Sequence, residues 1–252
     1  MSAWTWAAAR SRGTSHEKAG TRIQDAFSCW SPASSLPIVA LVSDGAGTAS
    51  HGGEGASLVC RSLMTQARRH FSTSLDLPSD EDLAIWFDTT RDLLSAVALR
   101  HSRELRDFAA TSVSVISTGS QTVIAHVGDG CAVLREANSG RWIAPSWPQH
   151  GEYAATTCFV TDAGALQLRI TRVQSGVSAF AVFSDGIERL ALDFAAQEPS
   201  HKFFDKISAP VGISTNKGRD GKLSRSLKTY LGSPTVNART DDDKSLVVAV
   251  IK

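Results

Sequence analysis

Five aspartates stand at the ends of short apolar segments whose length and composition are typical of buried β-strands. They are Asp25, Asp44, Asp129, Asp185 and Asp242. Glycine directly follows three of them, and Asp44 and Asp185 both stand in a Ser-Asp-Gly sequence. One Asp-Gly pair alone marks an ordinary turn. Five aspartates at strand ends indicate instead that one site gathers several carboxylates.

Clustered carboxylates repel one another, so they stay ionised together only around cations. A ligand set of oxygens without histidine or cysteine favours hard octahedral ions, Mg²⁺ or Mn²⁺. Two such ions, roughly 3.5–4 Å apart, can hold a bridging hydroxide and clamp a phosphoryl group for in-line attack. The pattern therefore predicts a metal centre for phosphoryl chemistry.

The segment from Ile38 to Phe71 must position Asp44, around which the chain is organised. Residues 38–42 form an apolar run that predicts a buried strand, and a glycine-rich loop follows it. Apolar residues then recur at helical spacing as far as Phe71. Ser79 with Asp82 predicts the capped start of a second helix over 79–106, which we expect to pack beside the first.

Most of the remaining sequence has the pattern of strands. Strands are predicted at 5–10 (an edge strand), 25–30, 111–117, 122–127, 131–135, 142–143, 157–161, 166–173, 179–183 and 246–251. Hairpin turns are predicted at 119–120, 128–130 and 138–140, and helical segments at 187–192, 199–207 and 222–231. We expect 209–221 to be mobile. Hairpins beside two long helices predict an α+β fold built in layers.

Composition excludes several classes of protein. The 252 residues are 42% hydrophobic and 20% charged, which is ordinary for a globular chain, here predicted as one domain over 1–252. A net charge of +1 with scattered basic residues gives no footprint for nucleic acid or an anionic membrane. The four cysteines form no C-x-x-C pair, which predicts free thiols in a reducing compartment. With no apolar run of ~20 residues, we expect a cytoplasmic protein.

Two other chemistries fit the sequence less well. Gly45-Ala46-Gly47 after a strand is similar to a dinucleotide-binding loop, but its third glycine and the acid about twenty residues on are missing. Asp44 would also repel a pyrophosphate. A serine nucleophile has no support either, since the G-x-S-x-G pattern is absent.

The acidic motifs occur in a specific order along almost the whole chain. They are Gln24-Asp25-Ala26, Val42-Ser43-Asp44-Gly45-Ala46-Gly47, Ala109-Ala110-Thr111, His126-Val127-Gly128-Asp129-Gly130, Phe183-Ser184-Asp185-Gly186 and Asp242-Asp243-Lys244-Ser245. This order resembles the PP2C (PPM) family of metal-dependent Ser/Thr protein phosphatases. Gly13-Thr14-Ser15-His16 and Gly151-Glu152-Tyr153-Ala154 make the chain most similar to the bacterial single-domain branch.

The resemblance implies a four-layer α-β-β-α sandwich of two antiparallel sheets flanked by helix pairs. It implies that Asp44 bridges two ions, Mn²⁺ or Mg²⁺, with the Gly45 carbonyl and three further carboxylates, those of Asp25, Asp185 and Asp242. Asp129 with Asp185 would match a weaker third metal site, and residues 147–157 would match a flap over the site. A metal-held hydroxide would attack the phosphorus of phosphoserine or phosphothreonine directly, without a phospho-enzyme.

The chain departs from the family pattern near the phosphate. Gly20 stands where many members carry an arginine, so Arg22 is a candidate for gripping phosphate, with a solvated side chain as the alternative. Ala46 stands where eukaryotic members place a histidine that acts as general acid. His16 could donate a proton or bind phosphate, or it could make only a structural hydrogen bond. The choice of Asp242 over its neighbours as ligand rests on the D-x-x-S spacing to Ser245.

The sequence therefore predicts a protein phosphatase, with Asp44, Asp185 and His16 in catalytic roles. Alternatives are a non-catalytic member that binds phosphoproteins or regulates a partner, and a hydrolase of small phosphate esters. Expected partners are a phosphorylated protein and, by analogy with the branch, a Ser/Thr kinase and a von Willebrand A-type protein.

Overall fold

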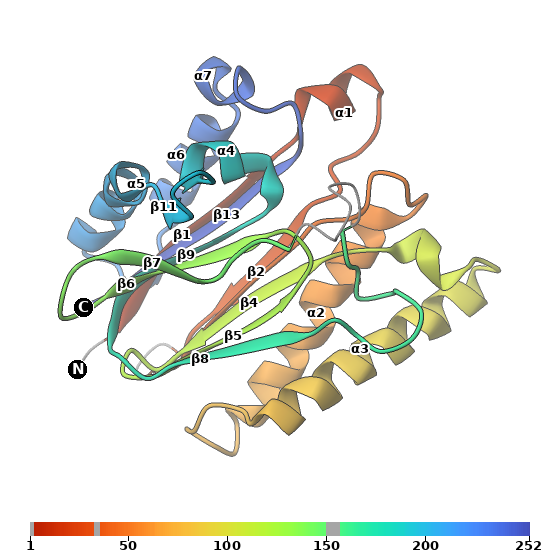
Figure 1. The fold of residues 1–252 in the computed structure, drawn as a ribbon, viewed down its shortest axis with the longest axis horizontal. Helices are drawn as coiled ribbons and strands as arrows, with labels where there is room; N and C mark the ends of the chain where they lie inside the picture. Colours follow the sequence, from red (N-terminus) through yellow and green to blue (C-terminus); the bar gives the residue numbers. More distant parts are fainter. Residues whose placement is uncertain (1–2, 33–35, 150–156) are drawn as a thin grey trace.

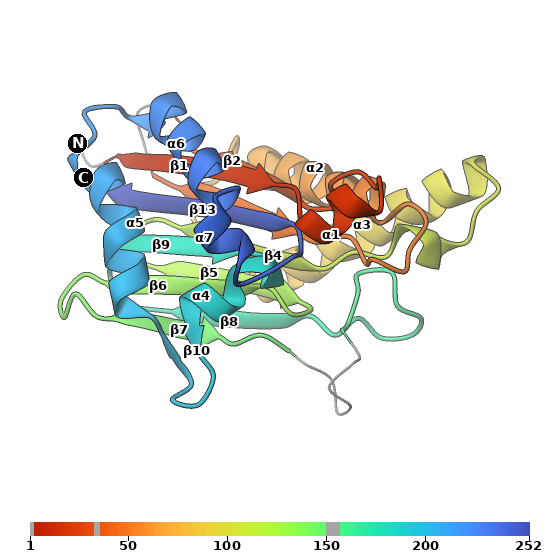
Figure 2. The same ribbon diagram turned by 90° about the horizontal axis from the view of Figure 1, so that it is seen from above.

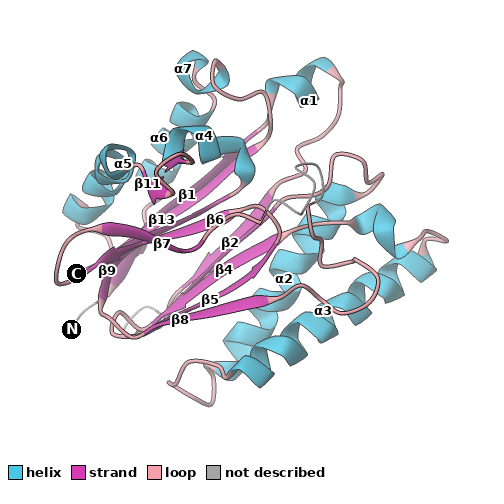
Figure 3. Cartoon of the chain, in the orientation of Figure 1, coloured by secondary structure: helices cyan, strands magenta, loops and turns pink. Residues whose placement is uncertain are grey.

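The structure, a computed structural model, describes residues 3–32, 36–149 and 157–252. Two β-sheets lie face to face at its centre, and helices cover the outer face of each sheet (Figures 1 and 3). The view from above in Figure 2 shows the helices of one side over the six-stranded sheet. The predicted four-layer sandwich is confirmed.

One sheet has five antiparallel strands in the order β2-β3-β4-β5-β8. Their bounds are β2 Ala26–Trp30, β3 Ile38–Ser43, β4 Ser112–Ser117, β5 Thr122–Val127 and β8 Arg169–Val173. Its outer face is covered by α2 (Gly52–His70) and α3 (Asp80–Arg100), with the 3₁₀ turn η1 (Leu105–Phe108) after them.

The other sheet has six strands in the order β12-β1-β13-β9-β6-β7. Their bounds are β1 Trp4–Ser11, β6 Cys131–Glu136, β7 Trp142–Ser146, β9 Val177–Phe183, β12 Gly218–Arg219 and β13 Lys244–Ile251. Helices α5 (His201–Ile213) and α6 (Gly221–Leu231) cover it. Short elements are α1 Thr14–Lys18, η2 Asp185–Ile187, α4 Glu188–Ala191, β10 Leu192–Asp193, β11 Glu198–Pro199 and α7 Pro234–Asn237.

Strand β3 shows why this sequence builds layers. All six of its residues are buried. Ile38, Ala40 and Val42 face the second sheet, while Val39 and Leu41 face α2 and α3. Because both faces of the strand are covered, the run is continuously apolar instead of alternating with polar residues. The central antiparallel strands of this fold therefore have the continuously apolar sequence pattern that is typical of buried parallel strands.

The loop from Gly128 to Gly130 is not the predicted hairpin turn. Strand β5 pairs with β4 and β8, whereas β6 pairs with β7 and β9, so this loop carries the chain from one sheet to the other. Gly128 has φ +102°, and an added Cβ would lie 2.6 Å from the Thr111 side chain. A tight crossing and a tight hairpin both need glycine here, so the sequence did not distinguish them.

Four other predictions need correction. Strand β1 is not an edge strand, because β12 pairs with it in parallel on its outer side. Residues 157–161 form no strand, and α3 ends at Arg100. Helix α5 continues through Pro210 to Ile213 because Val211 packs into the core, so much of 209–221 is regular structure.

Two observations concern the protein's environment. The four cysteines are free, and Cys60 and Cys131 are buried, as predicted. Within the described residues, no helix combines the length and the apolar character that crossing a lipid bilayer requires.

Candidate active site

Strand register brings the aspartates to one end of the sandwich. Ala26 pairs with Ser43, so Asp25 and Asp44 lie next to each other, just beyond the paired ends of β2 and β3. The same end of the six-stranded sheet carries Asp185, since Phe183 pairs with Leu246, the third residue of β13. Asp242 stands two residues before β13.

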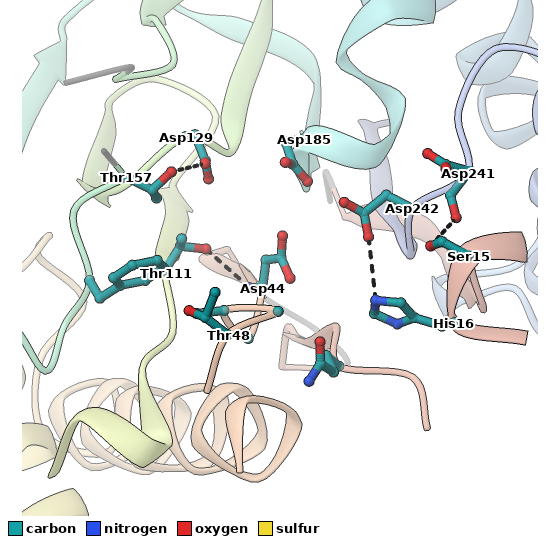
Figure 4. Close-up of a pocket in the computed structure, with 15 residues that line it drawn as sticks. Ser15, His16, Asp44, Thr48, Thr111, Asp129, Thr157, Asp185, Asp241 and Asp242 are labelled. Carbon is teal, nitrogen blue, oxygen red and sulfur yellow. Dashed lines mark hydrogen bonds and ion pairs between the residues drawn. The ribbon is translucent and has the colours of Figure 1, made fainter. Parts of the chain in front are cut away.

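The carboxylates surround a cavity of about 520 Å³, which we call the acid cavity. Figure 4 shows its side chains pointing toward a common space from both sheets. It is lined by Ser15, His16, Gln24, Asp44, Gly45, Ala46, Gly47, Thr48, Thr111, Asp129, Thr157, Phe159, Asp185, Asp241 and Asp242. Of the predicted site residues, only Asp25 and Arg22 are absent from this lining. Asp25 is fully buried, and Arg22 lines a neighbouring hollow.

The electrostatics of the acid cavity oppose ionisation. Burial raises the pKa of Asp25 to about 6 and that of Asp185 to about 8. Burial also raises the pKa of Asp44 far above its usual range, and the charges of Asp25 and Asp185 raise it further. The pKa of Asp242 is raised by burial as well. Carboxylates whose pKa values are all raised in this way lack a neighbouring positive charge that would stabilise their ionised form.

Unpaired atoms support binding of a cation. One carboxylate oxygen each of Asp25, Asp129 and Asp185 is buried without a hydrogen-bond partner. In the part of the chain that the structure describes, no three or more Asp, Glu, His or Cys side chains are already arranged so that they could hold a metal ion. The set consists of hard oxygen donors, and an ion that drew them together would satisfy the unpaired oxygens. These residues therefore fit Mn²⁺ or Mg²⁺.

Hydroxyl groups orient the carboxylates. Ser184 donates to Asp25 at 2.7 Å, and Thr157 donates to Asp129 at 2.6 Å. Thr111 accepts the amide hydrogen of Asp44 on its side chain and donates its own amide to the Asp44 carbonyl. Sequence reasoning gave these three residues no role. The Ala-Ala-Thr and Ser-Asp-Gly motifs were the only signals for Thr111 and Ser184.

Gly45 is required by packing. It forms an isolated bridge with Ala110, and an added Cβ would lie 2.2 Å from the carbonyl carbon of Gly52 at the start of α2. The first turn of α2 therefore lies directly against the loop that carries Asp44. Any side chain at this position would push α2 away and move the loop that lines the acid cavity.

Comparison with known proteins decides the family. Residues 12–232 match the family described as Protein phosphatase 2C. The chain belongs to this family. Serine/threonine-protein phosphatase 3 of Escherichia coli (strain K12) is 35% identical to it over 252 residues, 98% of each chain. The resemblance to the bacterial branch of the family is thereby confirmed.

Solved structures share the fold of this phosphatase. A bacterial serine phosphatase superposes with a TM-score of 0.66 at 12% identity, covering 98% of this chain and 97% of the other. The catalytic domain of the serine/threonine protein phosphatase PstP, solved with two manganese ions, gives 0.64 at 15% identity, covering 100% and 99%. These two structures extend the agreement in fold to nearly the whole chain.

Asp242 and Asp243 of this phosphatase differ in their contacts near His16. Both oxygens of Asp243 are used, because Oδ1 accepts the Gly13 amide at 2.6 Å and Oδ2 accepts the Gln24 amide and contacts His16 Nδ1 at 3.0 Å. Asp242 instead lines the acid cavity, 3.9 Å from His16 Nε2. Asp243 therefore orients His16, whereas Asp242, whose Oδ1 accepts the Asp243 amide at 2.7 Å, lines the acid cavity together with Asp241.

A second buried cluster contains His126, Ser146 and Arg169, and we call it the His126 cluster. His126 Nδ1 lies 2.7 Å from the Ser146 hydroxyl and 2.9 Å from an Arg169 guanidinium nitrogen. The same arginine donates to the Trp147 carbonyl at 2.6 Å. Burial lowers the pKa of His126 to about 3, and the charge of Arg169 lowers it further. The imidazole is therefore neutral.

Proposed function

We propose that the acid cavity is a two-metal centre at which this phosphatase hydrolyses phosphoserine and phosphothreonine in proteins. The observation that carries the proposal is the position of Asp44 between two further buried carboxylates, each with an unpaired oxygen. Asp25 and Asp185 raise the pKa of Asp44 by their charges, so all three lie within electrostatic reach of one another. A shared pair of cations would relieve that repulsion.

The proposed ligands are Asp25, Asp44, Asp185, Asp242 and the carbonyl oxygen of Gly45. Asp44 would lie between the two ions, and Asp129 with Asp185 would hold a weaker third one. When bound, the ions would activate water and neutralise charge on the phosphoryl oxygens. We propose that water attacks phosphorus directly, with no covalent enzyme intermediate.

The chain's own groups would handle the leaving alkoxide and the phosphate. His16 lines the acid cavity and is held by Asp243, so it is placed to give a proton to the serine or threonine oxygen. Arg22 is exposed in the adjoining hollow, with Gln24 lining both spaces. We propose that Arg22 reaches from this hollow toward the phosphate. The predicted flap at 147–157 falls largely outside the described residues.

The decisive experiment is hydrolysis of a phosphothreonine peptide with Mn²⁺ or Mg²⁺, with and without chelator. Turnover should require the ion and disappear with the chelator, and a selective Zn²⁺ chelator should have no effect, since the proposed ligands are all oxygens. Ion binding without turnover of peptide or p-nitrophenyl phosphate would favour a non-catalytic phosphoprotein-binding module. Tightly held zinc in the purified protein would contradict the proposed ligand set.

The site gives little information about which protein is the substrate. A phosphorylated protein is the proposed substrate class. A partner kinase and a von Willebrand A-type protein stay predictions from the branch, and dephosphorylation of such a kinase by the purified phosphatase would test the first of them.

A further inference from the structure

Cations from distant parts of the sequence gather along one edge of the sandwich. They are Arg10, Arg22, Arg219, Arg225 and Lys228, and together we call them the basic groove. Arg10 is on β1, and Arg225 and Lys228 are on α6, which packs against β1. Figure 2 shows α6 above this edge, where β1 and β2 lie. A sequence in which basic residues are scattered therefore folds into a concentrated positive surface.

The basic groove consists of two hollows that meet at Arg10. One hollow, of about 420 Å³, is lined by four of the cations together with Phe27 and Ser224, and none of the described residues that line it is a carboxylate. The other, of about 670 Å³, contains Arg10 and Arg22 together with one carboxylate, that of Glu54. Gln24 lines both this second hollow and the acid cavity. The basic groove thus begins beside the acid cavity and leads away from it to α6.

The positive charges in the basic groove outnumber the one carboxylate that lines it among the described residues, that of Glu54. All five side chains are exposed, and among the described residues none of them forms an ion pair. Arg10 donates to the Asp25 carbonyl, and Arg219 lies over the Trp6 ring at 5.8 Å. Some exposed arginines elsewhere do form ion pairs, as Arg141 does with Glu198 and Arg172 with Asp80.

We propose that the basic groove binds an acidic segment of the protein substrate, next to the phosphorylated residue that enters the acid cavity. This rests on the proposed function for the acid cavity. Unpaired cations in a concave surface attract anions and steer their approach. A peptide can place acidic residues on one side of the phosphoresidue and leave the other side neutral.

The neighbouring charges favour a peptide over a nucleic acid. An extended nucleic acid carries one phosphate per nucleotide along its whole length. If it followed the basic groove, it would meet the carboxylates of Asp241 and Asp242 at the mouth of the acid cavity. An acidic peptide avoids this repulsion because its charge can be confined to a few residues.

Three phosphothreonine peptides would test the proposal. One has glutamates before the phosphothreonine, one has them after it, and one has glutamines in both places. We expect kcat/KM to be about tenfold higher for one acidic peptide than for the glutamine peptide at low salt. The advantage should shrink as salt rises from about 50 to about 300 mM, because exposed charges are screened.

A pair of matched variants localises the effect. Arg225→Glu with Lys228→Glu should remove the advantage of the acidic peptide, and it should change turnover of the glutamine peptide and p-nitrophenyl phosphate by less than about twofold. Lys202→Glu with Lys206→Glu makes the same charge change at exposed positions of α5, over the same sheet. This control should keep the advantage. Equal loss in both variants, or none in the α6 variant, would overturn the proposal.

Binding gives a readout that does not depend on catalysis. A fluorescent acidic peptide with unphosphorylated threonine should bind the wild type more tightly than the α6 variant, measured by anisotropy. If no peptide is hydrolysed at all, the proposed function fails, and this measurement alone decides about the basic groove. Equal peptide binding by both proteins overturns the proposal. Preferential binding of a single-stranded oligonucleotide, lost in the α6 variant, would overturn it too.

Discussion

The acid cavity and the His126 cluster both bury ionisable groups, and only two residues of the chain stand between His126 and Asp129. In the acid cavity, burial raises the pKa of Asp25 and Asp185. In the His126 cluster, burial lowers the pKa of the imidazole to about 3. Both shifts favour the neutral form of the group.

The two regions differ in what satisfies that neutral form. Neutral His126 has partners on Nδ1, since Ser146 and Arg169 both lie within hydrogen-bond distance of it, whereas its Nε2 and the Nε of Arg169 are buried without a partner. The acid cavity leaves one oxygen each of Asp25, Asp129 and Asp185 without a partner. The unpaired atoms of the His126 cluster are nitrogens, one of them on a cationic guanidinium, which would repel a metal ion. Those of the acid cavity are carboxylate oxygens, which are the ligands that Mn²⁺ and Mg²⁺ prefer. This difference teaches that the chemistry of the unpaired atoms, more than shifted pKa values, points to the proposed metal centre.

The largest expected effect is on turnover after Asp185→Asn. The change removes a charge from the proposed ligand set and keeps the size of the side chain, so we expect kcat to fall by roughly a thousandfold or more. Thermal unfolding of the chelated protein at pH 8 should be nearly unchanged, because Asp185 is at a strand end and not in the apolar core. Hydrolysis of a phosphothreonine peptide with saturating Mn²⁺ measures the loss.

Asp88→Asn is the matched control, since Asp88 is exposed on α3. It should keep wild-type activity. Turnover of Asp185→Asn within a few-fold of wild type would mean that this carboxylate does not hold an ion.

His16 and Arg22 should differ in their kinetic effect. A general acid acts in the transition state, so His16→Ala should lower kcat on a phosphothreonine peptide by roughly ten- to a hundredfold. An arginine that grips phosphate acts already in the substrate complex, so Arg22→Ala should mainly raise KM. Steady-state kinetics on the same peptide separates the two.

The leaving group provides the control for His16. The nitrophenolate of p-nitrophenyl phosphate hardly needs a proton, so the loss in His16→Ala should shrink with this substrate. Equal losses on both substrates would leave His16 with only its contact to Asp243. An unchanged KM for Arg22→Ala would show that its side chain stays in the neighbouring hollow.

Metal-linked stability should depend on pH in a direction set by the raised carboxyl pKa values. Asp25 and Asp185 titrate near 3.8 when unfolded, and near 6 and 8 in the metal-free fold. Their stabilisation of the metal-free protein is therefore full below about 4 and is lost as pH rises through 6 and 8. Bound ions reverse this pH dependence of stability, because ions bind only the ionised carboxylates.

The rise in Tm on adding Mn²⁺ should therefore be small at pH 5 and reach roughly 5–10 °C at pH 8, if the ion is present at about a hundred times its Kd. Calorimetry of chelated and Mn²⁺-loaded protein measures it. A rise of the same size at both pH values would contradict the buried, charge-deficient state of the metal-free carboxylates.

The sequence predicted well whatever depends on local pattern. The apolar run before Asp44, the capped helix after Ser79 and the strand-end aspartates all have local causes, and they lie as expected. The sequence did not predict which strands pair. The crossing at Gly128 and the place of β1 inside its sheet depend on partners more than a hundred residues away or on the opposite sheet.

The site was predicted only as far as its carboxylates. Thr111, Thr157 and Ser184 act through hydrogen bonds that exist only once the strands are assembled. The three neighbouring aspartates at 241–243 are equivalent by composition. The structure distinguishes Asp243 by its contacts with the Gly13 and Gln24 amides and with His16, far away in sequence.

The smallest expected effect is on the pH dependence of the free energy of unfolding. It concerns the His126 cluster, the second of the two regions compared. The folded protein keeps His126 neutral down to about pH 3, whereas the unfolded chain binds a proton at its ordinary pKa of 6.5. The stabilisation is therefore full above 6.5 and declines as pH falls toward 3, by ~2 kcal/mol between pH 7 and pH 5. The titration of the acid cavity is common to the wild type and His126→Gln and cancels between them, so the free energy of unfolding of the wild type relative to His126→Gln should fall by ~2 kcal/mol from pH 7 to pH 5. Denaturant unfolding of both metal-free proteins at the two pH values measures this difference, and the exposed His101→Gln should show no such change relative to the wild type. A difference that stays the same at both pH values would show that His126 accepts a proton in the folded state, and the contrast with the acid cavity would then fail.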